Sequence, residues 1–332
     1  MGGADAAAPV RPLVPVLVGP TAVGKTAVAL ELARHAAVSI ISADARQVYR
    51  GLDIGTAKPD LAVRARVPHY GIDLIDPGER YSAGRFASDA VGWLDEIQRA
   101  GRQPLVVGGT GFYVKALGDG LFREPPLDLA TREALRSWTA ELPLSRAAHW
   151  AARLDRGFAG GGRQRAARAI EVALLTGRPL SWWQRNARQN GAMRPWYIHL
   201  TLPRDALVRR ITERVDGMLR AGFVAEVAGA LGRGVPSHAP GLDGIGYREA
   251  GLMLEGSLPE SELRDAIIRS TRRYAKRQET WFRNQLRGSG KGEAGIVWDL
   301  DATSAPDVLA ARILERWNAS SPPASPFPLP AS

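Results

Sequence analysis

Eight residues decide the fold of this chain: Gly19-Pro20-Thr21-Ala22-Val23-Gly24-Lys25-Thr26. They follow an apolar run, residues 13–18, and lead into an alanine- and leucine-rich run, residues 27–33, so the local pattern is strand, glycine loop, helix. The backbone N–H groups of such a loop cradle phosphate oxygens, and the helix N-terminus adds positive potential. We expect a loop that binds a di- or triphosphate, a nucleotide such as ATP included, with Lys25 at the terminal phosphates and the Thr26 hydroxyl on Mg²⁺. The alternative is a plain glycine turn before a helix.

Composition narrows the class of protein. The 332 residues include 44 Lys and Arg against 34 Asp and Glu, a formal net charge of +10 that predicts a polyanionic partner. There is no cysteine and the five histidines lie far apart, which argues against disulfides and thiolate metal sites. We see no signal peptide and no apolar run long enough for a membrane helix, so we expect a cytoplasmic protein without a membrane partner.

Two further buried strands are predicted beside the loop, at residues 38–42 and 104–107. Asp44 directly follows the first, at the strand end where open α/β sheets bind ligands, so we expect it near the loop; a helix cap or a turn is the alternative role. The second ends in Gly108-Gly109-Thr110, where many P-loop hydrolases have a magnesium-binding Asp. A transferase that grips a diphosphate is therefore more plausible than an ATP hydrolase.

Other segments complete the predicted fold. A short strand is expected at residues 72–75 and a helix from the cap Ser82 to about residue 99. Residues 125–190 lack β-rich runs and carry three predicted helices, at 131–142, 144–156 and 164–176. The segment interleaves arginines with tryptophans, which suits RNA, although a solvated face over an aromatic core would look similar.

The last part of the chain returns to the sheet. We predict a strand at residues 196–202, a helix at 204–220, a glycine-punctuated loop at 241–248 and a strand at 296–300 followed by a helix at 305–317. The longest predicted helix, residues 259–285, carries basic residues on one face, which indicates an anionic partner: Arg269, Arg272, Arg273, Lys276, Arg277 and Arg283.

The predicted fold class is therefore α/β, a P-loop NTPase-like parallel sheet flanked by helices, with an all-helical insertion. We expect a flexible leader over residues 1–12, the first part of the core over 13–120, the insertion over 121–195, the rest of the core over 196–318 and a disordered tail over 319–332.

Several segments in order resemble one family, the tRNA dimethylallyltransferases or tRNA isopentenyltransferases (IPP transferase family), over about residues 13–285. Besides the loop, the segments that carry the resemblance are residues 41–51, 53–59, 81–83, 107–113, 168–172 and 246–248, and 275–278 with Trp281. The family transfers a dimethylallyl group from its diphosphate to N6 of the adenosine directly 3′ of the anticodon. The resemblance thus implies dimethylallyl diphosphate and the tRNA anticodon stem-loop as partners, and we expect a monomer.

The resemblance also implies roles for single residues. Asp44 would accept the N6 proton, and Thr110 would touch the target nucleotide. Arg214, or as an alternative Arg210, would stabilise the departing diphosphate. The implied tRNA contacts are Asp44, Ala45, Arg46, Gln47, Thr110, Arg132, Gln164, Arg165, Ala166, Ala167, Arg168, Asp243, Gly244, Ile245, Gly246, Tyr247, Arg248, Lys276, Arg277, Gln278, Trp281 and Arg283.

Two departures from the family pattern concern the RNA. Ala45 stands where many members have Ser, and Gly160-Gly161-Gly162 replaces a stretch that often contains Asp-Pro. Two other functions remain open: an isopentenyltransferase acting on free adenine nucleotides, which would not need the basic insertion, and a nucleotide-switched RNA-binding protein, which would not need Asp44.

Overall fold

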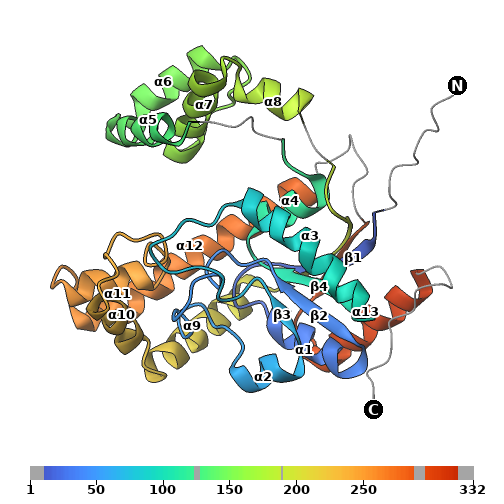
Figure 1. Cartoon of the computed structure of the whole chain (residues 1–332). Coiled ribbons are helices and arrows are strands. Elements are labelled where there is room, and N and C mark those ends of the chain that lie inside the picture. The colour runs from blue at the N-terminus through green and yellow to red at the C-terminus, as the bar shows by residue number, and fades with distance from the viewer. Residues whose placement is uncertain (1–10, 123–127, 188–189, 288–295, 321–332) are drawn as a thin grey trace, which may run out of the picture. The chain divides into compact units, whose positions relative to one another are not determined.

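A parallel sheet forms the centre of the larger part of this computed structural model (Figure 1), which describes residues 11–122, 128–187, 190–287 and 296–320. Within these residues the sheet has six strands in the order β3-β2-β4-β1-β5-β6. Their bounds are β1 Leu13–Val18, β2 Val38–Ser42, β3 His69–Tyr70, β4 Gln103–Gly108, β5 Arg194–Thr201 and β6 Ile296–Asp301. Every pairing is parallel, so the carboxyl ends of all six strands lie at one edge.

Helices cover the sheet because its buried strands are apolar on both faces. Helices α1 (Lys25–His35) and α13 (Pro306–Ser320) pack against one face, where Val28, Leu32 and Ile313 join the same apolar core as β1, β4 and β5. Helix α3 (Ala83–Arg99) packs against β2 and β4. Its predicted cap is confirmed, since the Ser82 side chain accepts a hydrogen bond from the Arg85 N–H.

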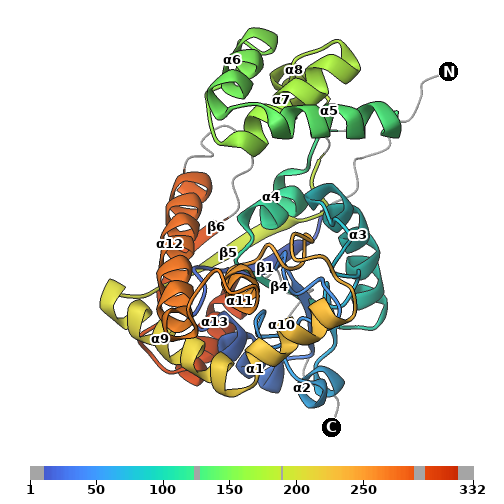
Figure 2. The same cartoon turned by 90° about the vertical axis from the view of Figure 1, so that its left-hand side faces the viewer.

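A second apolar core lies around the loop that follows β2. Helices α9 (Arg204–Arg220), α10 (Phe223–Gly232), α11 (Tyr247–Leu254) and α12 (Glu260–Arg287) contribute to it, and Figure 2 shows them turned toward the viewer. Val48, Leu52 and Phe223 are fully buried there. This core fixes the backbone directly after Asp44.

The chain divides into two compact units, one of residues 1–118 with 192–332 and one of residues 119–191. The second unit is helical, with α5 (Leu129–Glu141), α6 (Leu144–Leu154), α7 (Arg163–Thr176) and α8 (Leu180–Asn186). Alanines at the α6–α7 contact, Ala147, Ala151, Ala166 and Ala169, are fully buried and let the helices approach closely. The predicted insertion end at residue 195 is too late, because β5 begins at Arg194 and continues the sheet.

Other differences from the sequence analysis concern short elements. No strand forms at residues 72–75, where Ile75 makes a single bridge to Tyr49; the edge strand is β3 instead. Helices α2 (Leu61–Arg66), α4 (Gly111–Asp119), α8, α10 and α11 were not predicted, and α11 begins at Tyr247 inside the loop predicted at residues 241–248. Ten residues of the expected leader and residues 321–332 of the expected tail lie outside the described residues, and residues 319 and 320 belong to α13. No helix in the described part of the chain combines the length and apolarity needed to cross a membrane.

Candidate active site

The glycine loop joins β1 to α1 as the sequence predicts. Its backbone takes left-handed conformations at Ala22 and Gly24, where φ is 65° and 108°. A Cβ atom on Gly19 would lie 2.6 Å from the Leu200 carbonyl oxygen, so only glycine fits where the loop passes β5. The Lys25 ammonium donates to the carbonyl oxygens of Gly19 (2.9 Å) and Pro20 (2.8 Å) and thus lies across the loop.

Lys25 has an unusual charge environment. Burial lowers the pKa of its ammonium to about 8, although the charge of Asp44 acts in the opposite direction; the charge of Arg214 lowers the pKa further. A lysine held this way loses its proton far more readily than an exposed one. Asp44 and Arg214 therefore lie close enough to Lys25 for their charges to act on its pKa.

Asp44 lies two residues beyond β2, where its Oδ1 accepts a hydrogen bond from the Arg46 N–H at 2.8 Å. Burial lowers the pKa of Arg214, on α9, and the Asp44 carboxylate raises it. Asp44, Lys25 and Arg214 thus come together from β2, the glycine loop and α9. The arrangement sets a potential proton acceptor close to two cations.

Thr110 follows β4 and braces the loop that carries Asp44. Its N–H donates to the Ala43 carbonyl oxygen (3.1 Å), and its Oγ1 accepts from the Ala45 N–H (3.0 Å). The contact at position 45 uses only the backbone, so an Ala there keeps it. Thr110 fixes the residues on both sides of Asp44.

Tyrosines surround this carboxylate, and no role was predicted for them. Burial first, and then the charge of Asp44, raise the pKa of the Tyr274 hydroxyl to about 12, with a side-chain hydrogen bond to Thr110 opposing the shift. The pKa of Tyr113 is raised by burial and by the charges of Tyr49 and Asp44. Both hydroxyls stay protonated at neutral pH. The signals that the sequence offers for them are their places at the end of segment 107–113 and directly before segment 275–278, both of which carry the family resemblance.

Arg210 is used differently from Arg214. Its Nη1 donates to the Val23 carbonyl oxygen (2.8 Å) and its Nη2 to the Ala302 carbonyl oxygen (3.1 Å). It therefore ties the top of the glycine loop to the turn after β6. Arg214, beside Asp44 and Lys25, is the better placed of the two for contact with a diphosphate.

The predicted RNA contacts of the larger unit fall into exposed and internal groups. Asp243, Arg248, Lys276, Arg277 and Arg283 are exposed. Two others form hydrogen bonds inside the unit. The Gln47 amide accepts from Ser42 Oγ (2.7 Å) and donates to the Thr56 carbonyl oxygen (3.2 Å). The buried Tyr247 donates its hydroxyl to Glu226 at 2.6 Å.

Further predicted contacts in this unit are buried glycines or half-buried side chains. Gly244 and Gly246 are buried, and Ile245 and Trp281 are half-buried. Arg46 is half-buried and donates to the carbonyl oxygens of Pro240 (2.7 Å) and Asp243 (3.3 Å), so it shapes the loop before α11.

In the helical unit one carboxylate pairs with two of the predicted RNA-binding arginines and with one further arginine. Glu171 is 5% exposed and pairs with Arg132 (2.9 Å), Arg136 (3.0 Å) and Arg168. Burial raises its pKa, but the hydrogen bond from Arg136 and the charges of the arginines outweigh burial, so the pKa is lowered overall. Gln164 and Arg165 are exposed and Ala167 is half-buried, whereas Ala166 is fully buried.

Mg²⁺ was predicted at Thr26, which is exposed at the start of α1. No group of three His, Cys, Asp or Glu side chains that could hold a metal occurs among the described residues. Mg²⁺ usually keeps several waters and takes ligands from substrate phosphates, so it does not need an all-protein cage. Thr26 would be the protein ligand.

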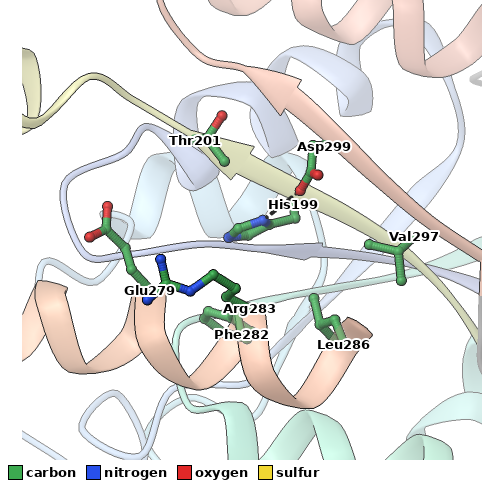
Figure 3. A pocket seen from close by; sticks show the side chains of 8 residues that line it. All are labelled: His199, Thr201, Glu279, Phe282, Arg283, Leu286, Val297 and Asp299. Carbon is green, nitrogen blue, oxygen red and sulfur yellow. Dashed lines mark hydrogen bonds and ion pairs between the residues drawn. The ribbon is translucent and has the colours of Figure 1, made fainter. Parts of the chain in front are cut away.

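A separate cavity of about 440 Å³ lies between α12 and the strands β5 and β6, of which β6 is at the edge of the sheet (Figure 3). His199 and Asp299 form its wall, joined by a hydrogen bond of 2.9 Å between Nδ1 and Oδ1. Of the predicted site residues only Arg283 lines it. The cavity is thus distinct from the group around Asp44.

Comparison with known proteins shows the family of the chain. A family model described as IPP transferase matches residues 47–285, and one described as isopentenyl transferase matches residues 12–64. This chain belongs to the IPP transferase family. A protein of Halorhodospira halophila named tRNA dimethylallyltransferase is 44% identical over 82% of this chain and 90% of its own length.

Solved structures give the same relationship for the fold. A tRNA delta(2)-isopentenylpyrophosphate transferase of Staphylococcus epidermidis is 29% identical, with a TM-score of 0.65 over 94% of this chain and 100% of that one. A eukaryotic dimethylallyltransferase acting on tRNA, 24% identical, shares the fold with a TM-score of 0.75 over 96% of this chain and 82% of that one. The predicted fold class and family are therefore confirmed.

Proposed function

We propose that this IPP transferase family member moves a dimethylallyl group from dimethylallyl diphosphate to N6 of the adenosine directly 3′ of the anticodon in tRNA. Diphosphate is the other product. The observation that carries the proposal is the grouping of Asp44 with Lys25 and Arg214, in which the charge of Asp44 acts on the pKa of both cations and Arg214 acts on the pKa of Lys25. It joins a proton acceptor to a cationic diphosphate site, and this reaction needs both.

The Asp44 carboxylate activates the nucleophile of the reaction. An aromatic amine is a poor nucleophile because its lone pair is delocalised into the ring. Asp44 accepts the N6 proton as the new C–N bond forms, a contribution of about 10²–10⁴-fold. The Arg46 N–H at 2.8 Å and the Thr110 contacts hold the carboxylate in place. The target base has to leave the stack of the anticodon loop to reach it.

The cations stabilise the leaving group, the diphosphate. As the allylic C–O bond breaks, its electron pair leaves with the diphosphate. Arg214, Lys25 and the backbone N–H groups of the loop stabilise the negative charge that develops there. The phosphates of dimethylallyl diphosphate bind to the glycine loop, Gly19 to Thr26. Mg²⁺ held by Thr26 and these phosphates would neutralise further negative charge.

A transfer assay tests the proposal. The purified chain, Mg²⁺ and radiolabelled dimethylallyl diphosphate are mixed with unmodified tRNA or with AMP, and the assay is repeated with Asp44→Asn. We expect label in tRNA, a loss of about 10²–10⁴-fold in Asp44→Asn, and unchanged tRNA binding by that variant.

The rivals predict other outcomes. Label entering AMP alone would favour a nucleotide-level transferase and contradict the proposal. Absence of transfer together with ATP-dependent RNA binding that survives Asp44→Asn would favour the nucleotide-switched RNA-binding protein. We also propose that the chain works in the cytoplasm and as a monomer. Gel filtration of the purified protein checks the monomeric state.

A further inference from the structure

One amide on α12 occupies a position that the helix otherwise fills with apolar or small side chains. Gln278 is 6% exposed and lies in the buried stripe that includes Thr271, Ala275 and Phe282. Burial of an unpaired amide is costly, so its donor and acceptor need partners inside the protein. The identity of those partners shows what the residue does.

Gln278 bridges two loops of the active site. Its Oε1 accepts a hydrogen bond from the Thr21 N–H of the glycine loop at 2.8 Å. Its Nε2 donates to the Gly109 carbonyl oxygen, in the turn after β4, at 2.9 Å. A Cβ atom on Gly109 would lie 2.3 Å from this Nε2, so the glycine leaves room for the amide.

Two neighbours on α12 fasten the same turn. Tyr274, one helical turn before Gln278, hydrogen bonds with the Thr110 side chain. Trp281, three residues after it, packs so closely that a Cβ atom on Gly111 would lie 2.2 Å from its ring. The inner face of α12 therefore sets the position of Thr110, which in turn braces Ala45 beside Asp44.

The opposite face of the same helix is exposed and basic. Lys276 and Arg277 directly precede Gln278, and Arg283 follows it. A tRNA phosphate bound by this face would act on a helix whose inner face is bonded to both the diphosphate loop and the Asp44 brace. One rigid helix thus connects the two substrate sites.

We propose that Gln278 is a positioning residue that couples binding of tRNA to binding of the diphosphate. It holds the Thr21 N–H and the Gly109 carbonyl oxygen in the register that α12 takes when tRNA occupies its basic face. This rests on the proposed function, because it requires tRNA on α12. Coupling of this kind is reciprocal, so each substrate tightens the binding of the other by the same factor.

The test measures that factor on the full chain. Calorimetry gives the Kd of inorganic pyrophosphate with Mg²⁺, with and without saturating unmodified tRNA. For the wild type we expect pyrophosphate to bind about fivefold tighter or more when tRNA is present. Gln278→Met keeps an unbranched chain but loses both hydrogen bonds, so this ratio should fall to about one.

The helix offers a matched control. Gln285, two turns further along α12, accepts a hydrogen bond from the Lys115 ammonium of α4 at 2.7 Å, away from the two bonds that Gln278 makes. Gln285→Met should keep the wild-type ratio. Gln278→Glu keeps an acceptor for the Thr21 N–H but lacks a donor for the Gly109 carbonyl oxygen at neutral pH. Its affinity ratio should therefore lie between those of the wild type and Gln278→Met. If circular dichroism shows that Gln278→Met is unfolded, Gln278→Glu replaces it in the test.

Failure of this inference differs from failure of the proposed function. A wild-type protein that prenylates tRNA but shows a ratio of one would overturn the coupling alone, as would a wild-type ratio in folded Gln278→Met. A wild-type protein that transfers no label to tRNA would overturn the proposed function instead.

Discussion

Arginines in the two units of this chain serve different purposes. In the larger unit, Arg210 and Arg46 donate to carbonyl oxygens of separate loops and fix the backbone around the site. In the helical unit, three arginines share the Glu171 carboxylate, which leaves an excess of two positive charges. The first arrangement sets geometry and the second supplies charge, although Lys and Arg exceed Asp and Glu by five in each unit. Net charge alone therefore does not say which arginines contact RNA.

The largest expected effect separates two arginines one helical turn apart on α9. Arg214→Gln removes a cation beside Lys25 and Asp44, so we expect kcat for prenyl transfer to fall by about 10²–10³-fold, as when a donor to developing negative charge is removed. Steady-state kinetics with dimethylallyl diphosphate and tRNA measures this.

Arg210→Gln is the matched change. It leaves the Val23 and Ala302 carbonyl oxygens without their donor, which should lower the free energy of unfolding by about 1–3 kcal/mol. Its loss of kcat should be smaller than that of Arg214→Gln. The opposite ranking of the two in kcat would assign the diphosphate to Arg210 and erase the distinction drawn above.

The second effect is a pH dependence. Because the pKa of Lys25 is lowered to about 8, the free loop carries its full charge below pH 8 and loses it above. Diphosphate favours the charged form, so its affinity should fall as pH rises above 8, by up to about tenfold per unit. Pyrophosphate calorimetry from pH 7 to 9.5 follows this loss. Lys25→Met removes the step but keeps the titration of pyrophosphate itself, and a wild-type profile parallel to that of Lys25→Met would contradict the assignment.

Much of the fold was predictable because its signals are local. The apolar run before Gly19, the glycine loop and the cap at Ser82 each specify their own element, and all three were located correctly. Short elements were missed because the contacts around them join residues that are far apart in the sequence. Helix α4 begins at Gly111 inside a glycine-rich stretch, where the Trp281 ring packs directly against Gly111, a contact between residues far apart in the sequence.

The site was predictable to the extent that strand ends converge in a parallel sheet. Asp44 and Thr110 each follow a strand, and the structure brings them together through the Ala45 N–H. What the sequence did not reveal is which polar residues face inward. Gln278 was predicted to contact tRNA among its basic neighbours, but helix periodicity alone could have placed it in the buried stripe with Ala275 and Phe282.

The third prediction tests whether the helical unit presents organised charge. Glu171→Gln raises the net charge by one, so charge alone would strengthen tRNA binding. We expect the opposite, a rise in Kd of about three- to tenfold, because three guanidinium groups lose the carboxylate that holds them and each contributes to phosphate contact. Filter binding at several salt concentrations measures both Kd and its salt dependence.

Glu133→Gln is the control for this change. Glu133 is exposed in the same unit and lies 3.7 Å from Arg136 without organising other arginines. The same gain of one positive charge should leave the Kd unchanged or slightly lower. If the two variants behave alike, Glu171 only stabilises the helices and the arginines act independently.

The smallest effect compares neighbouring residues on α12. Lys276 is exposed and Gln278 is buried, two positions apart. Lys276→Gln should weaken tRNA binding by about two- to threefold and reduce the slope of log Kd against log salt by about one, since it removes one phosphate contact. It should not change how much tRNA tightens pyrophosphate binding. A loss of that tightening in Lys276→Gln at saturating tRNA would mean that the coupling depends on this one phosphate contact and not on the seating of the whole helix by tRNA.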